Sequence, residues 1–282
     1  MRRLLFIYIC SCLLFPSAAF CWWETGHQTV ARIAASLLTA GAQAKVAEIL
    51  GVANTPDAVS DAMAKASTWA DETKAETGTG DWHFIDLALQ DTKANIPDRC
   101  SNDNCVTARI TLFARQLKTS SNLEALRYLI HFVGDIHQPL HAVSDADLGG
   151  NCELLNPTVG KAKNLHALWD GEIIDEMNMS DKELAASLEQ QLTTEQQQKL
   201  AAGSADDWAW ESHELAIADI YQKLHIPVEP IIFPKSCANA PSEITQFRTP
   251  VDGLYINSMK PVIQEQLLMG GVRLAKLLND VF

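Results

Sequence analysis

Hydrophobic residues recur at helical spacing along most of the chain after residue 28. Side chains three and four positions apart lie on one face of a helix, so each such stretch can bury one face and expose the other. Leu123–Ile136 is more apolar than the preceding stretch Thr107–Leu117, which predicts a more deeply buried helix. The expected helices cover Thr29–Leu38, Ala42–Leu50, Pro56–Ala70, Thr107–Leu117, Leu123–Ile136, Leu165–Met177, Trp208–Leu224 and Asn257–Leu278.

The segments between these helices are polar or irregular. Residues 91–105 read as a polar loop, and residues 144–163, with their Gly and Pro residues, as a loop or hairpin. Trp82–Leu87 is short enough to be helix or strand, Asp181–Ala202 is typical of solvated helices, and residues 225–250 are rich in proline. No repeat or linker divides the chain, so we expect one all-α, mostly helical domain over residues 22–282.

The first 21 residues have the composition of a cleaved secretory signal. Arg2 and Arg3 precede a short apolar run that ends near small residues, and the run is too short for a comfortable membrane span. We expect cleavage before Trp22, a secreted or periplasmic protein and no membrane anchor. The alternative is a lipid attached to Cys21, but the preceding Phe20 is bulky where such signals require a small residue.

The chain is acidic, with a net charge of −13 that becomes −15 when Arg2 and Arg3 leave with the signal. Such a charge argues against capture of duplex DNA by a basic surface. It does not exclude an enzyme whose bound metal ions reverse the charge locally.

Four cysteines follow the signal, which is an even number in a chain expected to be exported. Disulfides persist in such compartments. Cys100 and Cys105 are close in sequence, so we expect them to pair, which leaves Cys152 for Cys237. Free thiols or another pairing remain the alternatives.

Residues 131–141 carry the strongest chemical signal. His131 and Asp135 are four positions apart and so point the same way on a helix, while Pro139 breaks the spacing before His141. His166 and Asp170 repeat the four-residue spacing. One such pair alone is commonly a salt bridge or a buried histidine, but two such pairs, two further histidines and an Asp near Trp favour a metal site.

Three more segments offer ligands of the same kind: Trp22–His27, Trp69–Asp71 and Trp82–Asp86. They supply imidazoles and carboxylates, with no cysteine nearby. Zinc accepts these ligands at about 2.0–2.2 Å, and Mn and Fe accept similar sets, so the ligand types alone do not identify the metal.

Together these segments resemble the zinc-dependent nuclease and 3′-nucleotidase family of fungal single-strand nucleases and plant bifunctional nucleases. The family is related in fold to the zinc-dependent phospholipases C. The resemblance covers essentially all of residues 22–282. It is carried by the Trp at the expected mature start, Gly26-His27, Trp69-Ala70-Asp71, His83-Phe84-Ile85-Asp86, His131–His141, Asn164–Gly171 and Trp208–Ser212.

The resemblance implies a cluster of three zinc ions in a cleft. The first would be held by Asp71, His83, His131 and Asp135, and the second by His141, His166 and Asp170. The third would use Trp22, through its free α-amino group and carbonyl oxygen, with His27 and a bridging Asp135. The reference pKa of an α-amino group, near 8, is low enough for a metal to deprotonate it at neutral pH.

The same resemblance implies the reaction. Hydroxide activated by the metals would attack phosphorus, cutting single-stranded DNA and RNA to 5′-phosphorylated products and removing 3′-phosphates from nucleotides. Asp71 could orient the attacking water. Lys74 stands where many members carry Arg, and a lysine offsets charge without the bidentate geometry of a guanidinium.

Three further residues are candidates for substrate binding by resemblance. Phe84 would stack on a nucleobase and Asp86 would bond to its edge, and Asn151 could approach the substrate. Each has a structural alternative: a core aromatic, a local cap or ion pair, and a turn residue. No ligand role is assigned to His137, His213 or His225, although His137 could orient a ligand. A structural role is expected for Glu211 and Ser212.

We therefore expect an exported, monomeric, zinc-dependent nuclease with 3′-nucleotidase activity and no stable protein partner. The alternatives are a zinc-dependent phospholipase C and a non-catalytic exported zinc-binding protein. His83–Asp86 and Asn164–Asp170 favour the nuclease, and the complete ligand set argues against a non-catalytic role.

Overall fold

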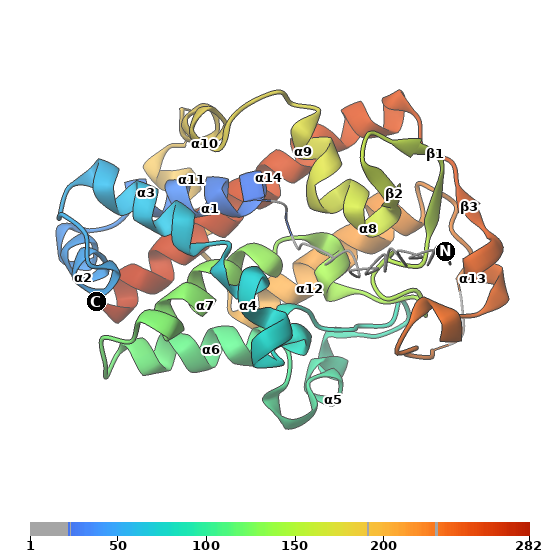
Figure 1. The fold of residues 1–282 in the computed structure, drawn as a ribbon, viewed down its shortest axis with the longest axis horizontal. Coiled ribbons are helices and arrows are strands. Elements are labelled where there is room, and N and C mark those ends of the chain that lie inside the picture. The colour runs from blue at the N-terminus through green and yellow to red at the C-terminus, as the bar shows by residue number, and fades with distance from the viewer. Residues whose placement is uncertain (1–21, 23, 191, 229–230) are drawn as a thin grey trace, which may run out of the picture.

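The fold is a layered assembly of helices around one long C-terminal helix (Figure 1). The computed structural model describes residues 22, 24–190, 192–228 and 231–282. Helix α14 crosses the molecule from end to end, with α1 and α7 packed against it. The principal helices are α1 (Glu24–Ser36), α2 (Ala40–Leu50), α3 (Pro56–Ala66), α4 (Trp69–Thr77), α6 (Val106–Leu117), α7 (Leu123–Asp135), α10 (Asp181–Glu189), α11 (Thr194–Leu200), α12 (Ala205–Leu215) and α14 (Gly253–Val281).

Helix α7 forms the centre of the core, as its apolar sequence predicts. The side chain of Asn122 accepts a hydrogen bond from the amide of Ala125 at 3.0 Å and so begins the helix. Every residue from Tyr128 to Asp135 is buried. The helix ends at Asp135, and a 3₁₀ turn, η4 (Pro139–Ala142), follows, with Pro139 at its start where no amide donor is needed.

The helix expected over Pro56–Ala70 is in fact two helices, and this prediction was wrong. Helix α3 ends before Ser67, and α4 begins at Trp69. The Ser67 hydroxyl donates to the carbonyl oxygen of Ala64 at 2.7 Å, which favours an end to the helix at this point. In a continuous helix, the carbonyl oxygen of Ser67 would accept a hydrogen bond from within the helix. The break leaves this oxygen free to accept a hydrogen bond from His131 Nδ1 instead.

Two of the predicted helices change their winding. Leu165–Met177 contains α8 (Leu165–Ala167), a π-helical turn η5 (Leu168–Glu172) and α9 (Ile173–Asp175). Helix α12 likewise continues as the π-helical turn η6 (Ala216–Tyr221). The wider turn of η5 carries Asp170, and π turns are often found at functional positions.

The polar and proline-rich segments contain only short elements. They are η1 (Gly80–His83), η2 (Lys93–Asn95), α5 (Ile96–Arg99), η3 (Ser101–Asp103), η7 (Cys237–Asn239) and α13 (Ser242–Gln246). After η1, residues 84–87 are neither helix nor strand. The hairpin anticipated within 144–163 is formed by β1 (Leu154–Val159) and β2 (Ala162–Asn164), and β3 (Arg248–Thr249) pairs in parallel with β1.

A mostly helical domain is therefore confirmed, with one small sheet, in the order β2-β1-β3, at the edge of the molecule. Both expected disulfides are present, Cys100–Cys105 and Cys152–Cys237, with Cα–Cα distances of 5.3 and 5.2 Å. Among the described helices, none has the length and apolar character needed to cross a bilayer. The predicted signal lies outside the described residues.

Candidate metal centre

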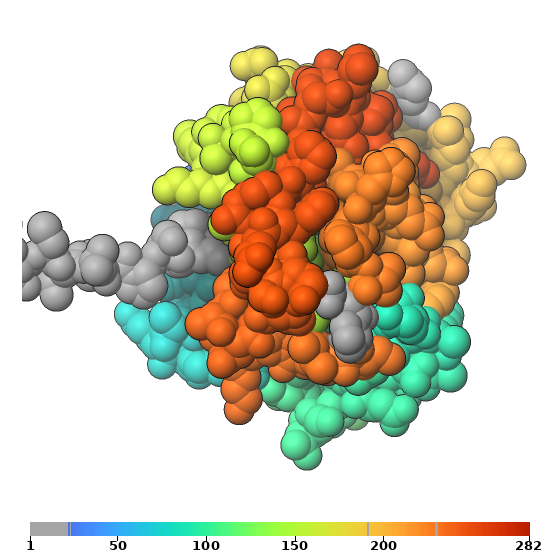
Figure 2. Space-filling view, turned by 90° about the vertical axis from the view of Figure 1, so that its right-hand side faces the viewer, coloured from blue at the N-terminus to red at the C-terminus, as the bar shows by residue number. Residues whose placement is uncertain are grey.

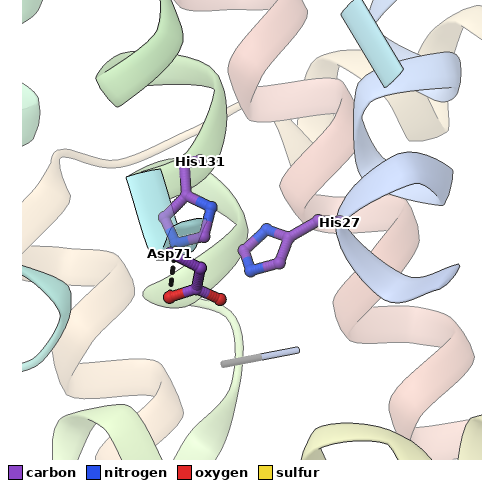
Figure 3. Close-up of side chains that lie close together, drawn as sticks. All are labelled: His27, Asp71 and His131. Carbon is purple, nitrogen blue, oxygen red and sulfur yellow. Dashed lines mark ion pairs between the residues drawn. The ribbon is translucent and has the colours of Figure 1, made fainter. Parts of the chain in front are cut away.

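The fold brings all eight predicted imidazole and carboxylate ligands into one buried cluster. Three groups have ligand atoms that all lie within 4.8 Å of one another. The groups are His27, Asp71 and His131; His83, His131 and Asp135; and His141, His166 and Asp170. Figure 3 shows the first group, in which side chains from α1, α4 and α7 point toward one another.

Asp135 lies at the centre of the cluster. Its Oδ2 is 2.9 Å from His83 Nδ1 and 3.1 Å from His131 Nε2. Its Oδ1 is 3.4 Å from His27 Nε2 and 3.6 Å from His141 Nδ1. One carboxylate therefore faces histidines from four different segments, which is the position that a bridging ligand requires.

The second pair on one helix, His166 and Asp170, lies beside His141. His166 Nε2 is 3.2 Å from Asp170 Oδ2, and His141 Nε2 is 3.7 Å from Asp170 Oδ1. The 3₁₀ turn that begins at Pro139 directs the chain away from the axis of α7 and so brings His141 to His166 and Asp170.

Backbone carbonyl oxygens fix the orientation of three of the imidazole rings. His131 Nδ1 lies 2.5 Å from the oxygen of Ser67, His141 Nδ1 3.0 Å from that of His83, and His166 Nδ1 2.6 Å from that of Gly149. A carbonyl accepts only from a protonated nitrogen, so each contact selects the tautomer whose Nε2 has a free lone pair. Metal-binding histidines are held by such contacts.

The ligand atoms themselves have the features of a metal site. Both ring nitrogens of His27, both carboxylate oxygens of Asp135 and Nε2 of His141 are buried and make no hydrogen bond within the described part of the chain. Buried polar atoms are normally hydrogen-bonded, and a site for an ion is one of the few reasons for an exception. The residues present therefore fit a bound metal.

The electrostatics of the chain agree with this fit. Burial, with nearby His131, lowers the pKa of His27, and burial lowers that of His141 to about 4. Both rings are thus neutral at pH 7, as metal ligands must be. Burial opposes protonation of His131, yet Asp135 and Asp71 raise its pKa to about 9. The two carboxylates attract positive charge at this position.

Trp22, the ninth predicted ligand, is fully buried beside the cluster. Its indole Nε1 donates to the carbonyl oxygen of Gly134 at 2.8 Å. Gly134 is also where His27 approaches α7, because a Cβ at this position would lie 2.6 Å from His27 Nδ1. Trp22 and His27 thus meet α7 at the one residue that has no side chain.

A cavity of about 360 Å³ opens beside the cluster. Lys74 lies on its wall with Nζ 3.0 Å from Asp71 Oδ1. Phe84, Asp86 and Asn151 line it as well, so all the predicted substrate-binding residues share one cavity with the ligands His83, His141 and His166. Asn151 also has the turn role considered above, since its Nδ2 donates to the oxygen of Leu148 at 2.9 Å.

Helix α12 holds the ligand segment 135–142 at both ends; a structural role was expected for Ser212, but the sequence did not indicate its partner. The Ser212 hydroxyl donates to the oxygen of Ile136 at 2.6 Å, next to Asp135. His213 Nδ1 lies 3.1 Å from the oxygen of Ala142, next to His141. The resemblance included the motif Trp208–Ser212. The partners of Ser212 and His213 are 76 and 71 positions away in the sequence, so no regular spacing predicts these contacts.

A second set of contacts runs from the same helix through α14. Glu211 Oε2 accepts from Arg273 at 2.6 Å, and another guanidinium nitrogen of Arg273 lies 2.9 Å from His137 Nε2. Burial and the charge of Arg273 lower the pKa of His137 to about 3. His137 is therefore a neutral acceptor that fixes the ligand segment rather than a ligand, as expected.

Comparison with known proteins places the chain in a family. Residues 22–282 match the family described as S1/P1 Nuclease. Endonuclease 3 of Arabidopsis thaliana is 31% identical over 94% of this chain and 90% of its own length. Nuclease S1 of Aspergillus oryzae is 32% identical over 58% of both chains. Nuclease P1 of Penicillium citrinum is 35% identical over 53% of this chain and 57% of its own. The chain therefore belongs to the S1/P1 nuclease family, and it is a nuclease.

Proposed function

We propose that this nuclease is zinc-dependent, binds three zinc ions, cuts single-stranded DNA and RNA to 5′-phosphorylated products, and removes 3′-phosphates from nucleotides. The observation that carries the proposal is the cavity in which Phe84 and Asp86 lie directly beside the ligand cluster. A nucleobase held there would place its phosphate against the metal ligands.

The first zinc would be held by Asp71, His83, His131 and Asp135, and the second by His141, His166 and Asp170. The third would be held by His27, Asp135 and the α-amino group and carbonyl oxygen of Trp22. The central position of Asp135 supports its role as a bridge. His27 also groups with Asp71 and His131, so the third ion would lie close to the first.

Zinc bound here would lower the pKa of a water molecule and offset the charge of the phosphate. The chain supplies the rest. Asp71 orients the attacking water, and the ammonium group of Lys74, held by Asp71, faces the cavity to balance the negative charge that develops on phosphorus.

Phe84 and Asp86 would select the substrate. Stacking on an aromatic ring requires a base whose face is open, and in a duplex both faces are covered by neighbouring bases. Phe84 is half-buried and lines the cavity, so an unpaired base could reach it while a stacked one could not. This supports a single-stranded substrate.

Export would complete the site. The match to the nuclease family begins at Trp22, which is also where cleavage of the predicted signal would create the new N-terminus. We therefore propose a secreted or periplasmic, monomeric enzyme without a membrane anchor. No observation favours the phospholipase alternative, since the relatives compared above are all named as nucleases.

The substrate proposal is tested with the chain beginning at Trp22. The protein is incubated with zinc and single-stranded DNA, duplex DNA, RNA, a 3′-mononucleotide and phosphatidylcholine, and the products are separated. We expect 5′-phosphorylated nucleotides from the single strands, and phosphate from the mononucleotide. Asp71→Asn is expected to lose at least about 10²-fold in rate, because one oxygen ligand and the water-orienting group are both affected. Equal cleavage of duplex DNA would contradict the single-strand proposal.

The role of Trp22 is tested separately by adding one residue before it. An α-amino group moved by one residue can no longer reach the ion held by His27 and Asp135, so bound zinc is expected to fall from three equivalents to two. Zinc is counted by atomic spectroscopy, with the chain that begins at Trp22 as the control. Three equivalents in the extended protein would show that the amine is not a ligand.

A further inference from the structure

A short exposed segment, residues 231–235, combines apolar and basic side chains on the face shown in Figure 2. Ile231 is 51% exposed, Ile232 42% and Phe233 37%. Lys235 is exposed too and forms no ion pair with any residue that the structure describes. In a chain of net charge −13, this segment offers a cation and apolar surface together, a combination that can bind a ligand.

Arg99 holds Phe233, the middle residue of this segment. The guanidinium of Arg99 lies over the ring of Phe233, 4.5 Å from its centroid. Asp91 holds the guanidinium in place with two hydrogen bonds of 2.7 and 2.8 Å. Arg99 also stabilises the charged form of Asp86, which lines the cavity. Arg99 thus interacts with both Phe233 and the cavity residue Asp86.

A disulfide fixes the chain two residues after this segment, at Cys237. Cys237 is bonded to Cys152, which follows the cavity residue Asn151. Cys237 also packs in one small cluster with Leu148, another residue of the cavity wall. Residues 233–237, which we call the rim, are therefore attached at both ends to groups that interact with or adjoin cavity residues: Arg99 near Asp86, and Cys152 with Leu148.

The side chains of this rim have the chemistry that binds a nucleic-acid strand. One face of the Phe233 ring is covered by Arg99, and the exposed remainder offers a surface for a base. Base–aromatic stacking tolerates any sequence, and a lysine nearby attracts the backbone phosphate. Because the rim adjoins the cavity, the base that it can reach belongs to the nucleotide next to the one inside.

We propose that Phe233 and Lys235 form a second nucleotide subsite, in which the base neighbouring the bound nucleotide stacks on Phe233 and a backbone phosphate lies near Lys235. This inference rests on the proposed function, because it assumes that a nucleotide occupies the cavity. It predicts that the rim strengthens the binding of chains relative to single nucleotides.

The test compares substrates of different length. KM is measured for a 3′-mononucleotide, which has no neighbouring base, and for an oligonucleotide of about six residues, with wild type, Phe233→Ala, Phe233→Trp and Lys235→Ala. Phe233→Ala is expected to raise KM for the oligonucleotide about tenfold and to leave KM for the mononucleotide within about twofold. Phe233→Trp should retain wild-type KM, and Lys235→Ala should weaken the salt dependence of binding.

Leu123→Ala and Lys118→Ala are the matched controls. Leu123 is 38% exposed, close to the 37% of Phe233, but it lies at the start of α7, at the other end of this helix from the metal ligands. Lys118 is an exposed lysine at the end of α6. Neither is expected to change KM for either substrate. An equal loss on both substrates in Phe233→Ala, or wild-type KM in that variant, would overturn the proposal.

Binding without cleavage separates this inference from the proposed function. With metal removed by a chelator, anisotropy of a labelled oligonucleotide reports affinity alone. Weaker binding by Phe233→Ala supports the subsite even if no cleavage is seen in any assay, whereas failure of wild type to cleave counts against the proposed function. Equal affinity of wild type and Phe233→Ala counts against the subsite whatever the activity.

Discussion

At the scale of single residues, the metal centre depends on a few positions where the backbone comes close. Gly134 lies between two ligands of α7, accepts a hydrogen bond from Trp22 and leaves room for His27. Gly149 has a left-handed φ of 58° and presents its carbonyl oxygen to His166. A side chain at either residue would meet a neighbour at under 3 Å, so both positions require glycine for close contact, and Gly149 requires it for conformation as well.

Gly134→Ala is expected to remove His27 from the cluster. The added Cβ would lie 2.6 Å from His27 Nδ1, a distance that cannot be kept, while alanine favours the helix itself by about 1 kcal/mol. The variant should therefore fold, bind one zinc fewer and lose activity, as measured by atomic spectroscopy and by cleavage of single-stranded DNA.

The control for this variant is Gly253→Ala, where an added Cβ meets nothing within 4 Å. It should keep both zinc content and activity. Full zinc content in Gly134→Ala would mean that His27 can bind its ion from another position.

At the scale of elements, the important relation is between α12 and the ligand segment that follows α7. Ser212 and His213 are adjacent in α12, and they contact the carbonyl oxygens of Ile136 and Ala142, on either side of the turn that begins at Pro139. A proline turn by itself sets a direction but does not hold it, since Pro139 donates no backbone hydrogen bond. Helix α12 supplies the missing restraint.

Ser212→Ala is expected to lower zinc affinity about 10- to 100-fold, the usual loss when a residue that positions ligands is removed. The hydroxyl donates to Ile136, next to Asp135, so any zinc held by Asp135 should be affected more than the one held by His166. Competition with a chromogenic chelator measures the affinities.

Ser258→Ala serves as the control, because its exposed hydroxyl donates to the carbonyl oxygen of Tyr255 within the same helix, α14. Zinc affinity there should match wild type. A Ser212→Ala protein that holds zinc as tightly as wild type would show that the hydrogen bond to Ile136 does not position Asp135.

At the scale of the whole molecule, the buried carboxyl group of Asp86 in the cavity makes the stability of the fold depend on pH. Burial, together with the carboxylates of Asp147 and Asp81, raises the pKa of Asp86 to about 7, against the opposing effect of Arg99. Between pH 3.8, the ordinary pKa of an aspartic acid, and about pH 7, Asp86 is thus protonated in the folded chain but ionised in the unfolded chain. The free energy of unfolding must fall as pH rises between these two values.

This dependence predicts a stability difference between wild type and Asp86→Asn. The protein is treated with a chelator, which avoids the added charge of metal ions. Because asparagine does not titrate, only wild type loses stability as the pH rises, so the free energy of unfolding of Asp86→Asn should increase relative to that of wild type from about pH 5 to about pH 8. The size expected is on the order of 1–3 kcal/mol. Urea unfolding at the two pH values measures it.

Asp98→Asn makes the same chemical change at an exposed carboxylate outside the cavity and serves as the matched control. If Asp86→Asn kept a constant difference from wild type, Asp86 would be ionised in the folded chain throughout this range.

The sequence alone determined the features that depend on neighbouring residues. Apolar spacing predicted α7 and α14, and the four-residue spacing of His131 with Asp135 and of His166 with Asp170 placed each pair on one side of its helix. Resemblance to the nuclease family supplied the grouping of these pairs with His27, Asp71 and His83. The structure confirms that these residues meet, while their roles as ligands stay a prediction.

Only the tertiary structure decided what holds those residues in position. The end of α3 at Ser67, the carbonyl oxygens that orient the imidazoles, and the contact of Ser212 with Ile136, 76 positions away, join segments remote in sequence. The same is true of Phe233 beside Arg99. Periodicity reports how a segment buries its own face, but a contact between distant segments depends on packing, and packing leaves no regular spacing in the chain.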